Sequence, residues 1–223
     1  MRTVLRELLR QAAVVLRANG RWWLLVLLVA GAGVALLLPT EAGWEQRLIV
    51  ADKHFANTVS FWGDFPRGWL MLIVLVGMLG WLLRKRNWQA VALAALLAGS
   101  AGGFQAHLLS SLIGRPRPST GMADGLRGPT WSRSYKSFPS AHSTCAFAVA
   151  TTLAVAMPAV GVPCLPLAAL VGWSRVALTS HHLSDVWFGM WLGILNGLIL
   201  GCAARRITDD TTPATVPNWR GPC

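Results

Sequence analysis

The chain has 223 residues, of which 54% are hydrophobic and 13% are charged, and its mean hydropathy is +0.48. Soluble globular domains carry about 25% charged residues, so this composition excludes an ordinary soluble domain and favours a membrane protein. The formal net charge of +11 does not indicate nucleic-acid binding, because the basic residues flank apolar runs, as expected for membrane topology and for anionic headgroups.

The N-terminal segment, residues 1–21, carries basic residues at spacings compatible with one helix, with leucine and valine between them: Arg2, Arg6, Arg10, Arg17 and Arg21. This pattern predicts a basic amphipathic helix on the cytoplasmic membrane surface. The apolar run that follows, 22–38, is long for the core of a signal peptide, and no A-x-A-like cleavage site follows it. We therefore interpret it as a retained first spanning helix.

Further apolar runs follow the first one, at 69–83, 88–113, 141–157, 165–178 and 186–204. Several are shorter than the ~20 residues that cross the hydrocarbon core, so their ends must extend into polar flanks. The predicted fold class is an all-α, polytopic membrane helix bundle, with about six transmembrane helices in one domain over residues 22–206. Residues 207–223 are polar and rich in proline and threonine, which predicts a disordered cytoplasmic tail.

The segment between the first two apolar runs has a helical stripe of its own. Within residues 40–68, positions on this stripe recur every three or four residues, at Trp44, Leu48, Ala51, Phe55, Thr58 and Trp62. This spacing predicts one helix, and we expect it to lie in the outer membrane interface, beside the path of a lipid into the protein. A re-entrant or irregular loop is the alternative.

Basic residues in short loops set the predicted orientation. Six spans place three basic groups on one side, which is then the cytoplasm: the N-terminal arginines, residues 84–86 and residues 205–206. Both termini are therefore predicted to be cytoplasmic, and the segments around 40–68, 114–140 and 180–185 face outward. A compact chain of this kind is expected in a bacterial inner membrane, with an outward site facing the periplasm.

Three outward segments together hold the residue types of a phosphate site: GRPRP at 114–118, FPSAHS at 138–143, and SR at 174–175 followed by His181 and Asp185. Positions four apart share one helix face, so Asp185 can orient the ring of His181 and aim its second nitrogen at a substrate. His142 follows Pro139 and Ser140 at a predicted helix start. Backbone N–H groups there can hold phosphate oxygens, and His142 can act as a general acid.

Arginines supply the positive charge that phosphoryl transfer requires. Arg117 and Arg175 can each present a planar fork to phosphate oxygens. Either arginine of the Arg-Pro-Arg-Pro motif can face inward, so Arg115 is a further candidate. Two-metal phosphatases need clustered carboxylates, and the outward motifs offer mainly Asp124 and Asp185. We therefore expect a histidine route that needs no metal and no cofactor.

These motifs resemble those of the type 2 phosphatidic acid phosphatase superfamily, the lipid phosphate phosphatases, whose sites are related to those of vanadium haloperoxidases. The family pattern is Lys, six residues and Arg-Pro; then Pro-Ser-Gly-His; then Ser-Arg, five residues, His, three residues and Asp. In this chain the third motif matches without a gap, the second has Ala141 in place of glycine, and the first matches at Arg117.

The resemblance implies a role for each matching residue. His181 would attack phosphorus to form a phosphohistidine, Asp185 would orient it, and His142 would protonate the leaving group and then activate water. The phosphate contacts that the resemblance implies are Arg117, Ser140, Ala141 at the glycine position, and Arg175.

The position of the family lysine is occupied by Ser110, and three interpretations are open. Lys136, just before the second motif, can supply the missing charge. His107, one helical turn from Ser110, can line the pocket as an ionisable residue inside a span. The third interpretation is that the site is weakened or lost.

The leading prediction is a lipid phosphatase that hydrolyses a phosphomonoester or diphosphate of an anionic lipid, such as phosphatidic acid, phosphatidylglycerol phosphate, a polyprenyl diphosphate or phosphorylated lipid A. A lipid-to-lipid phosphotransferase that uses the same histidine is a second interpretation, and a non-catalytic lipid-binding descendant is a third. The expected partners are the lipid phosphate substrate and membrane lipids, with no nucleic acid and no protein partner indicated.

Overall fold

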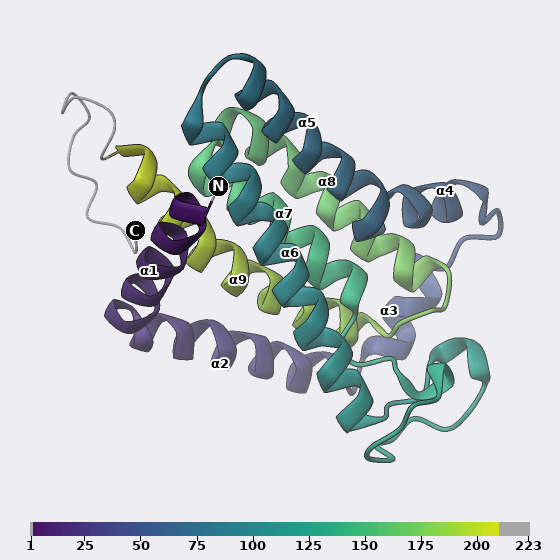
Figure 1. The fold of residues 1–223 in the computed structure, drawn as a ribbon. Helices are drawn as coiled ribbons and strands as arrows, with labels where there is room; N and C mark the ends of the chain where they lie inside the picture. Colours follow the sequence, from purple (N-terminus) through teal and green to yellow (C-terminus); the bar gives the residue numbers. More distant parts are fainter. Residues whose placement is uncertain (1, 210–223) are drawn as a thin grey trace.

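The structure is a computed structural model that describes residues 2–209 of the chain. Regular secondary structure in these residues is helical throughout (Figure 1). The described α-helices are α1 Arg2–Ala18, α2 Gly20–Leu37, α3 Glu41–Leu48, α4 His54–Trp62, α5 Leu70–Leu82, α6 Arg86–Ile113, α7 Ala141–Ala156, α8 Pro158–Ala177 and α9 Leu183–Asp209. A π-helical turn, η1 (Phe65–Trp69), leads directly into α5, and two 3₁₀ turns, η2 (Pro118–Thr120) and η3 (Arg133–Tyr135), lie between α6 and α7.

The predicted all-α membrane bundle is confirmed. Five helical stretches are long and apolar enough to cross a membrane: Gly20–Leu37, Phe65–Leu82, Arg86–Ile113, Pro158–Ala177 and Leu183–Thr208. The sixth predicted span is α7, which is apolar but has 16 residues, fewer than the ~20 that cross the hydrocarbon core. The run predicted at 165–178 belongs to a longer helix, because α8 begins at Pro158 and accommodates Pro163 and Pro166.

Helix α7 lies in the middle of the bundle, where α6, α8 and α9 pack around it. All side chains from Ser143 to Leu153 are buried. A helix enclosed by protein on its sides presents little surface to lipid, so its length need not match the membrane thickness. Its N-terminal end instead fixes where the second motif lies.

Helix α9 approaches α7 through a stripe of glycines spaced four residues apart: Gly189, Gly193, Gly197 and Gly201. A Cβ atom at Gly193 would lie 2.4 Å from the carbonyl oxygen of Thr144, and one at Gly197 would lie 2.8 Å from that of Ala148. Small residues at this spacing let two membrane helices approach to backbone contact. The glycine stripe therefore sets the distance between α7 and α9.

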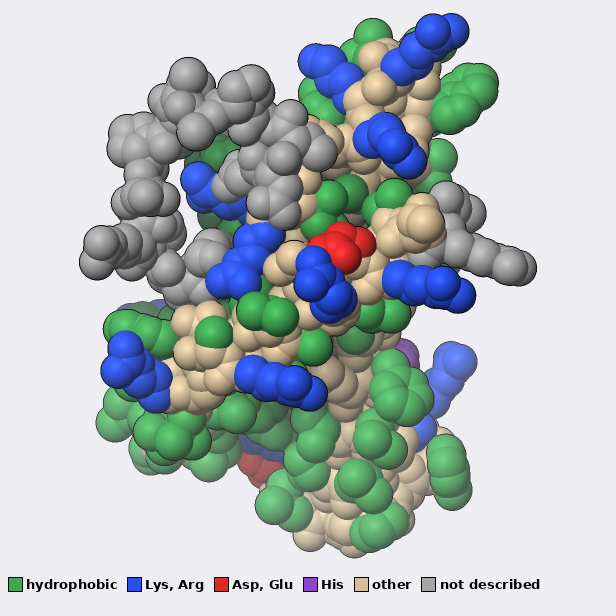
Figure 2. Space-filling view, turned by 60° about the vertical axis from the view of Figure 1, so that its left-hand side comes forward, with side chains coloured by type: hydrophobic (Ala, Val, Ile, Leu, Met, Phe, Trp, Pro, Cys, Tyr) green, Lys and Arg blue, Asp and Glu red, His purple; other side chains and the backbone are tan. Residues whose placement is uncertain are grey.

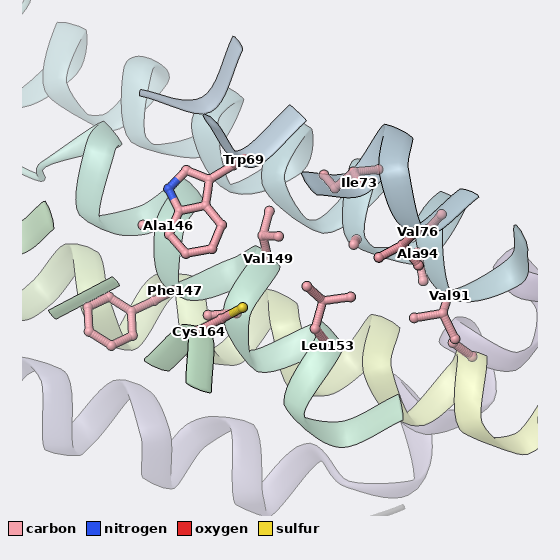
Figure 3. Close-up of a cluster of buried hydrophobic side chains, with 14 of the residues drawn as sticks. Trp69, Ile73, Val76, Val91, Ala94, Ala146, Phe147, Val149, Leu153 and Cys164 are labelled. Carbon is pink, nitrogen blue, oxygen red and sulfur yellow. The ribbon is translucent and has the colours of Figure 1, made fainter. Parts of the chain in front are cut away.

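An apolar core packs around α7 (Figure 3). Most of its side chains come from η1, α5, α6, α7 and α8, with a few from α1 and α9, and they include Trp69, Ile73, Val76, Val91, Ala94, Ala146, Phe147, Val149, Leu153 and Cys164. This core joins α5 to α6 and α7, and it holds the π-turn that precedes α5.

The outer segment 40–68 is not the single helix that its stripe predicts. It forms α3 and α4, because Ile49 adopts an extended conformation and Asp52 accepts a hydrogen bond from the N–H of His54 (2.9 Å), which starts a second helix. Both short helices contact α8, at the end of the bundle that also carries the loop 114–140 (Figure 1). Aromatic residues of the stripe remain about half exposed: Trp44 (50%), Phe55 (57%) and Trp62 (54%).

The opposite end of the molecule is rich in basic side chains. Helix α1 packs against α9 and buries Leu8 and Val15, and Figure 2, in which this side comes forward, shows Lys and Arg side chains spread over it. The exposed basic residues of α1 and of the two turns nearby are Arg6, Arg10, Arg17, Arg21, Arg84, Lys85 and Arg86. Of the predicted tail, residues 207–209 continue α9, and residues 210–223 lie outside the described residues.

We predict that Gly193→Ala lowers the stability of the protein, because the added methyl group meets the α7 backbone and overpacking of this kind costs about 1–3 kcal/mol. The measurement is the thermal unfolding temperature in detergent. The control is Gly31→Ala on α2, where a Cβ atom would meet nothing within 4 Å. Equal unfolding temperatures for the two variants would contradict a close α7–α9 contact.

Candidate active site

The three motif segments meet around one cavity of about 670 Å³ at the end of the bundle that carries the loop 114–140. Such a volume is ordinary for a small-molecule site. Its lining is strongly basic, since it includes His107, Arg117, Arg133, Lys136, His142, Arg175 and His181. Among the described residues that line the cavity, Asp64 is the one carboxylate. The cavity is therefore suited to an anionic ligand.

The first motif begins where α6 ends. Gly114 closes the helix in the left-handed conformation (φ 66°), and a Cβ atom at this position would lie 2.1 Å from the carbonyl oxygen of Gly128. After Gly114, the side chains of the two arginines of the motif point to different parts of the protein. Arg117 lines the cavity, whereas the side chain of Arg115 is buried on another side, among carboxylates.

All five N–H groups of Arg115 donate hydrogen bonds within the protein. Nε and Nη2 bind both oxygens of Asp124 (2.9 and 2.6 Å), Nη2 also binds Glu41 (2.6 Å), and Nη1 binds Ser184 Oγ and Asp185 Oδ1 (both 2.7 Å). The Arg115 guanidinium holds the pKa of Asp124 below its usual range. An arginine whose donors are all used in this way has no N–H left for phosphate.

Asp185 reaches His181 through Ser137 rather than by a direct hydrogen bond. Its Oδ2 atom accepts a hydrogen bond from Ser137 Oγ (2.5 Å) and lies 3.8 Å from His181 Nδ1. The Nδ1 atom of His181 instead lies 2.7 Å from the Ser137 carbonyl oxygen. A carbonyl can only accept, so Nδ1 carries the proton and the lone pair is on Nε2.

The environment of His181 favours its neutral form. Burial lowers its pKa and outweighs the opposing effect of Asp185, and the positive charges of Arg175 and Arg117 act in the same direction as burial. The ring lines the cavity. A neutral imidazole whose Nε2 lone pair is available beside an anion-binding cavity has the properties of a nucleophile.

The spacing between Arg175 and His181 follows from the end of α8. The helix stops at Leu178, Thr179 takes a left-handed conformation (φ 52°), and the N–H groups of Ser180 and His181 both return to the Arg175 carbonyl oxygen (3.0 and 3.2 Å). Five residues between arginine and histidine are the length of this turn. It places both side chains on the same cavity.

Two cavity arginines keep buried donors without a partner. Nη1 of Arg175 donates to Ser60 Oγ, and Nη2 of Arg117 donates to the Lys136 carbonyl oxygen (3.4 Å), but the Nε atoms of both arginines are buried and make no hydrogen bond in the described structure. Buried polar groups are normally satisfied. Two such donors beside a candidate nucleophile therefore indicate where an oxyanion binds.

Helix α7 begins at the second motif. Ser140 is its fully buried N-cap, and the Ser140 N–H donates to the Asp185 carbonyl oxygen (3.1 Å), which ties the start of α7 to the start of α9. Ala141 and His142 line the cavity. N–H groups in a first helical turn have no intrahelical acceptor, so those of Ala141 and His142 are available to an anion.

The structure also places the residues around the missing family lysine. Ser110 and His107 both line the cavity from α6, and Ser110 Oγ donates to the His107 carbonyl oxygen (3.0 Å). Lys136 lines it from the loop, with its ammonium 5.3 Å from the centre of the Trp131 ring. Both residues considered as substitutes for the lysine therefore reach the cavity.

Sequence reasoning missed carboxylates that the outer segment brings to the site. The expectation that mainly Asp124 and Asp185 lie near the motifs is wrong, because α3 folds onto the start of α9. There Glu41 accepts hydrogen bonds from Ser184 N and Oγ (3.1 and 2.5 Å), and Glu45 accepts one from the N–H of Leu183 (2.8 Å). No pattern in the sequence indicates this contact between α3 and α9.

The two glutamates also approach His182. Glu45 Oε1 lies 3.3 Å from His182 Nδ1, and the ligating atoms of Glu41, Glu45 and His182 lie within 4.8 Å of one another. Burial opposes the charged form of His182, but Glu45 and Asp185 outweigh it and raise its pKa. Negative charge near a helix start is stabilising, so this group holds the N-terminus of α9 in place.

Comparison with known proteins finds a family by sequence and a shared fold among solved structures. Residues 88–208 match the PAP2 superfamily. The chain is 35% identical over 139 residues to the decaprenylphosphoryl-5-phosphoribose phosphatase of Mycolicibacterium smegmatis, which covers 60% of this chain and 69% of the relative. It is 29% identical over 183 residues to the lipid A 1-phosphatase of Rhizobium etli, which covers 74% and 78%.

A solved structure shares the fold. The transmembrane PAP2-type phosphatidylglycerolphosphate phosphatase of Bacillus subtilis superposes with a TM-score of 0.62 at 23% identity, over 87% of this chain and 97% of that one. At this identity the likeness is one of fold.

We predict that Arg115→Gln destabilises the protein by about 3–5 kcal/mol, because it leaves buried carboxylates unpaired. The measurement is thermal unfolding in detergent. Arg115→Lys keeps the charge but loses the planar fork, so its unfolding temperature should lie between those of Arg115→Gln and the wild type. Arg127→Gln, on the exposed part of the same loop, should leave the unfolding temperature unchanged. If Arg115→Gln unfolded normally and only raised KM, Arg115 would be a substrate contact instead.

Proposed function

The chain belongs to the PAP2 superfamily, and we propose that this membrane lipid phosphatase hydrolyses a phosphate ester through a covalent phosphohistidine on His181. The observation that carries the proposal is the pair of unpartnered buried Nε atoms, on Arg117 and Arg175, in the cavity that His181 lines. Phosphoryl transfer requires positioning and neutralisation of charge on the phosphoryl oxygens. Both are supplied at this place.

In the first step, Nε2 of His181 attacks phosphorus. The P–N bond forms as the bond from phosphorus to the lipid oxygen breaks, and His142 gives its proton to that oxygen, so that a lipid alcohol leaves. Arg117, Arg175 and the first N–H groups of α7 hold the phosphoryl oxygens. Ser137, itself held by Asp185 (2.5 Å), keeps the Nδ1 proton in place while Nε2 reacts.

In the second step, His142 acts as a general base. It takes a proton from water, whose oxygen attacks phosphorus as the P–N bond breaks, and inorganic phosphate leaves. His181 returns to its neutral form and His142 is again protonated, so the pair is ready for another turnover. A histidine can serve both steps because its imidazole can donate a proton in one step and accept one in the other.

The relatives are a decaprenylphosphoryl-5-phosphoribose phosphatase, a lipid A 1-phosphatase and a phosphatidylglycerolphosphate phosphatase. We propose a lipid phosphomonoester of this kind as the substrate. The cavity of about 670 Å³ leaves room beside the phosphate for part of such a headgroup. Lys136, which also lines the cavity, supplies the charge that Ser110 does not.

We further propose that the site faces the periplasm of a bacterial inner membrane, with both termini in the cytoplasm. The basic end of the bundle supports this orientation by the positive-inside rule. We predict that Arg127→Cys is labelled by a membrane-impermeant maleimide on intact spheroplasts, and that Lys85→Cys is labelled only after the membrane is opened. The reverse pattern would exclude a periplasmic site.

The central prediction concerns the intermediate. Purified protein in detergent with EDTA should release phosphate from lipid phosphomonoesters, and acid-labile ³²P should be trapped on the protein by rapid quenching. His181→Ala should lose both signals, since removing a nucleophile removes the covalent route. Loss of release on adding EDTA, restored by a divalent cation, would show that a metal takes part.

The same assay tests the substitute for the family lysine. Lys136→Ala should raise KM for the lipid phosphate several-fold. An unchanged KM in Lys136→Ala with a raised KM in His107→Ala would assign that role to His107.

A further inference from the structure

The loop between α4 and α5 brings a carboxylate to the general acid. Asp64 Oδ1 lies 3.5 Å from Nε2 of His142, and the two side chains are 28% and 26% exposed. The other oxygen, Oδ2, accepts a hydrogen bond from Arg67 Nη1 (2.7 Å). One carboxylate is therefore shared between an arginine at the rim and a histidine in the cavity.

The position of Asp64 is fixed by its neighbours in the chain. Gly63 ends α4 against α8, where a Cβ atom would meet Val171 at 2.4 Å. The ring of Phe65 packs on α6, 2.2 Å from the place that a Cβ atom of Gly99 would occupy. A π-helical turn begins directly after Asp64, and such turns are frequent at functional sites. Asp64 is held between two spanning helices.

The charges around His142 indicate what its contact with Asp64 can do. Positive or ionisable groups line its cavity from the other elements: His107 on α6, Arg117, Arg133 and Lys136 on the loop, Cys145 on α7, Arg175 on α8 and His181 before α9. On the α4 side, His54 and Arg67 line an adjoining pocket that His142 also borders. Asp64 is the one carboxylate among the described residues that line the main cavity.

A general acid must carry a proton before the reaction, and nearby cations oppose that state. We propose that Asp64 is a positioning residue for His142, which holds the imidazolium ring beside the leaving oxygen and stabilises its charge. The proposal rests on the proposed function, since it assigns a partner to the acid of that mechanism. Arg67 in turn holds the carboxylate through Oδ2 and leaves Oδ1 to the histidine.

The effect on the reaction follows from the proton balance. In the first step the proton moves from His142 to the lipid oxygen, and Asp64 keeps that proton available until the P–O bond breaks. In the second step His142 takes a proton from water, and Asp64 stabilises the imidazolium as it forms. Asp64 gives up no proton in either step. Its removal should therefore matter most where the leaving group needs a proton.

The experiment compares two leaving groups. Asp64→Asn keeps the shape and removes the charge. We expect it to lower kcat/KM for a lipid alkyl phosphate, which reports the first step alone, by about tenfold, part of the usual contribution of a general acid. With p-nitrophenyl phosphate, whose leaving group departs without a proton, the loss in kcat/KM should be less than about twofold. Asp64→Glu should recover part of the activity, and Asp52→Asn, on the exposed turn before α4, is the control.

A pH profile gives a readout that a merely structural role would not move. Because His142 must be protonated in the first step, activity falls as pH rises. Loss of the nearby negative charge disfavours the imidazolium, so the alkaline limb for Asp64→Asn should move to lower pH by about one unit. An unchanged profile, with equal losses on both substrates, would overturn the proposal.

A double-mutant cycle separates this proposal from the proposed function. If Asp64 acts through His142, then Asp64→Asn should have no further effect in a His142→Ala background. The same tenfold loss in that background would overturn the proposal. Absence of His181-dependent phosphoenzyme in the wild type would instead refute the phosphohistidine mechanism, whatever the behaviour of Asp64.

Discussion

The contact between α7 and α9 is the constraint on which the site depends. Because four glycines of α9 lie against the backbone of α7, the two helices come closer than side chains would allow. His142 stands at the beginning of α7, and His181 and Asp185 lie just before and at the beginning of α9. A general acid and a nucleophile on two helices can act on one phosphate only if the two helices start close together. The hydrogen bond from Ser140 N–H to the Asp185 carbonyl oxygen (3.1 Å) joins the two helix starts.

The second constraint is electrostatic, and it works through Arg115. Three carboxylates, on Glu41, Asp124 and Asp185, converge on this one guanidinium. Buried ion pairs gain little net free energy unless they are completely hydrogen-bonded, and here every N–H of the arginine is used. Arg115 therefore holds Asp185 in one orientation. Asp185 in turn holds Ser137 through the Ser137 hydroxyl, and the Ser137 carbonyl oxygen fixes the Nδ1 proton of His181. The neutral tautomer of His181, the proposed nucleophile, is thus set by residues outside the cavity lining.

The sequence predicted the parts of the protein that depend on local pattern. Apolar runs located the spanning helices, and the spacing from Arg175 to His181 matches a turn at the end of α8. It could not separate Arg115 from Arg117, since alternating Arg-Pro residues look alike until the left-handed Gly114 sets the direction of the loop. It also treated segment 40–68 as one amphipathic helix, because the stripe of Trp44, Phe55 and Trp62 continues across the break near Ile49. Long-range contacts of polar residues leave no periodic signal, so Glu41 and Asp64 were missed.

Segment 40–68 and the family-matched region supply different parts of the site. Residues 88–208 match the family. They contain the residues that would carry out phosphoryl transfer: Arg117, His142, Arg175, His181 and Asp185. The segment before them supplies the groups that hold these residues: Ser60 binds Arg175, Asp64 lies beside His142, and α3 binds the start of α9. The reaction limits which residue types can occupy the catalytic positions of the matched region. Different supporting residues outside that region can hold His142 and His181 in the same places. Segment 40–68, which also borders the cavity through Asp64 and Phe65, is therefore where the surroundings of His142 and the shape of the cavity can vary without loss of the proposed phosphohistidine chemistry.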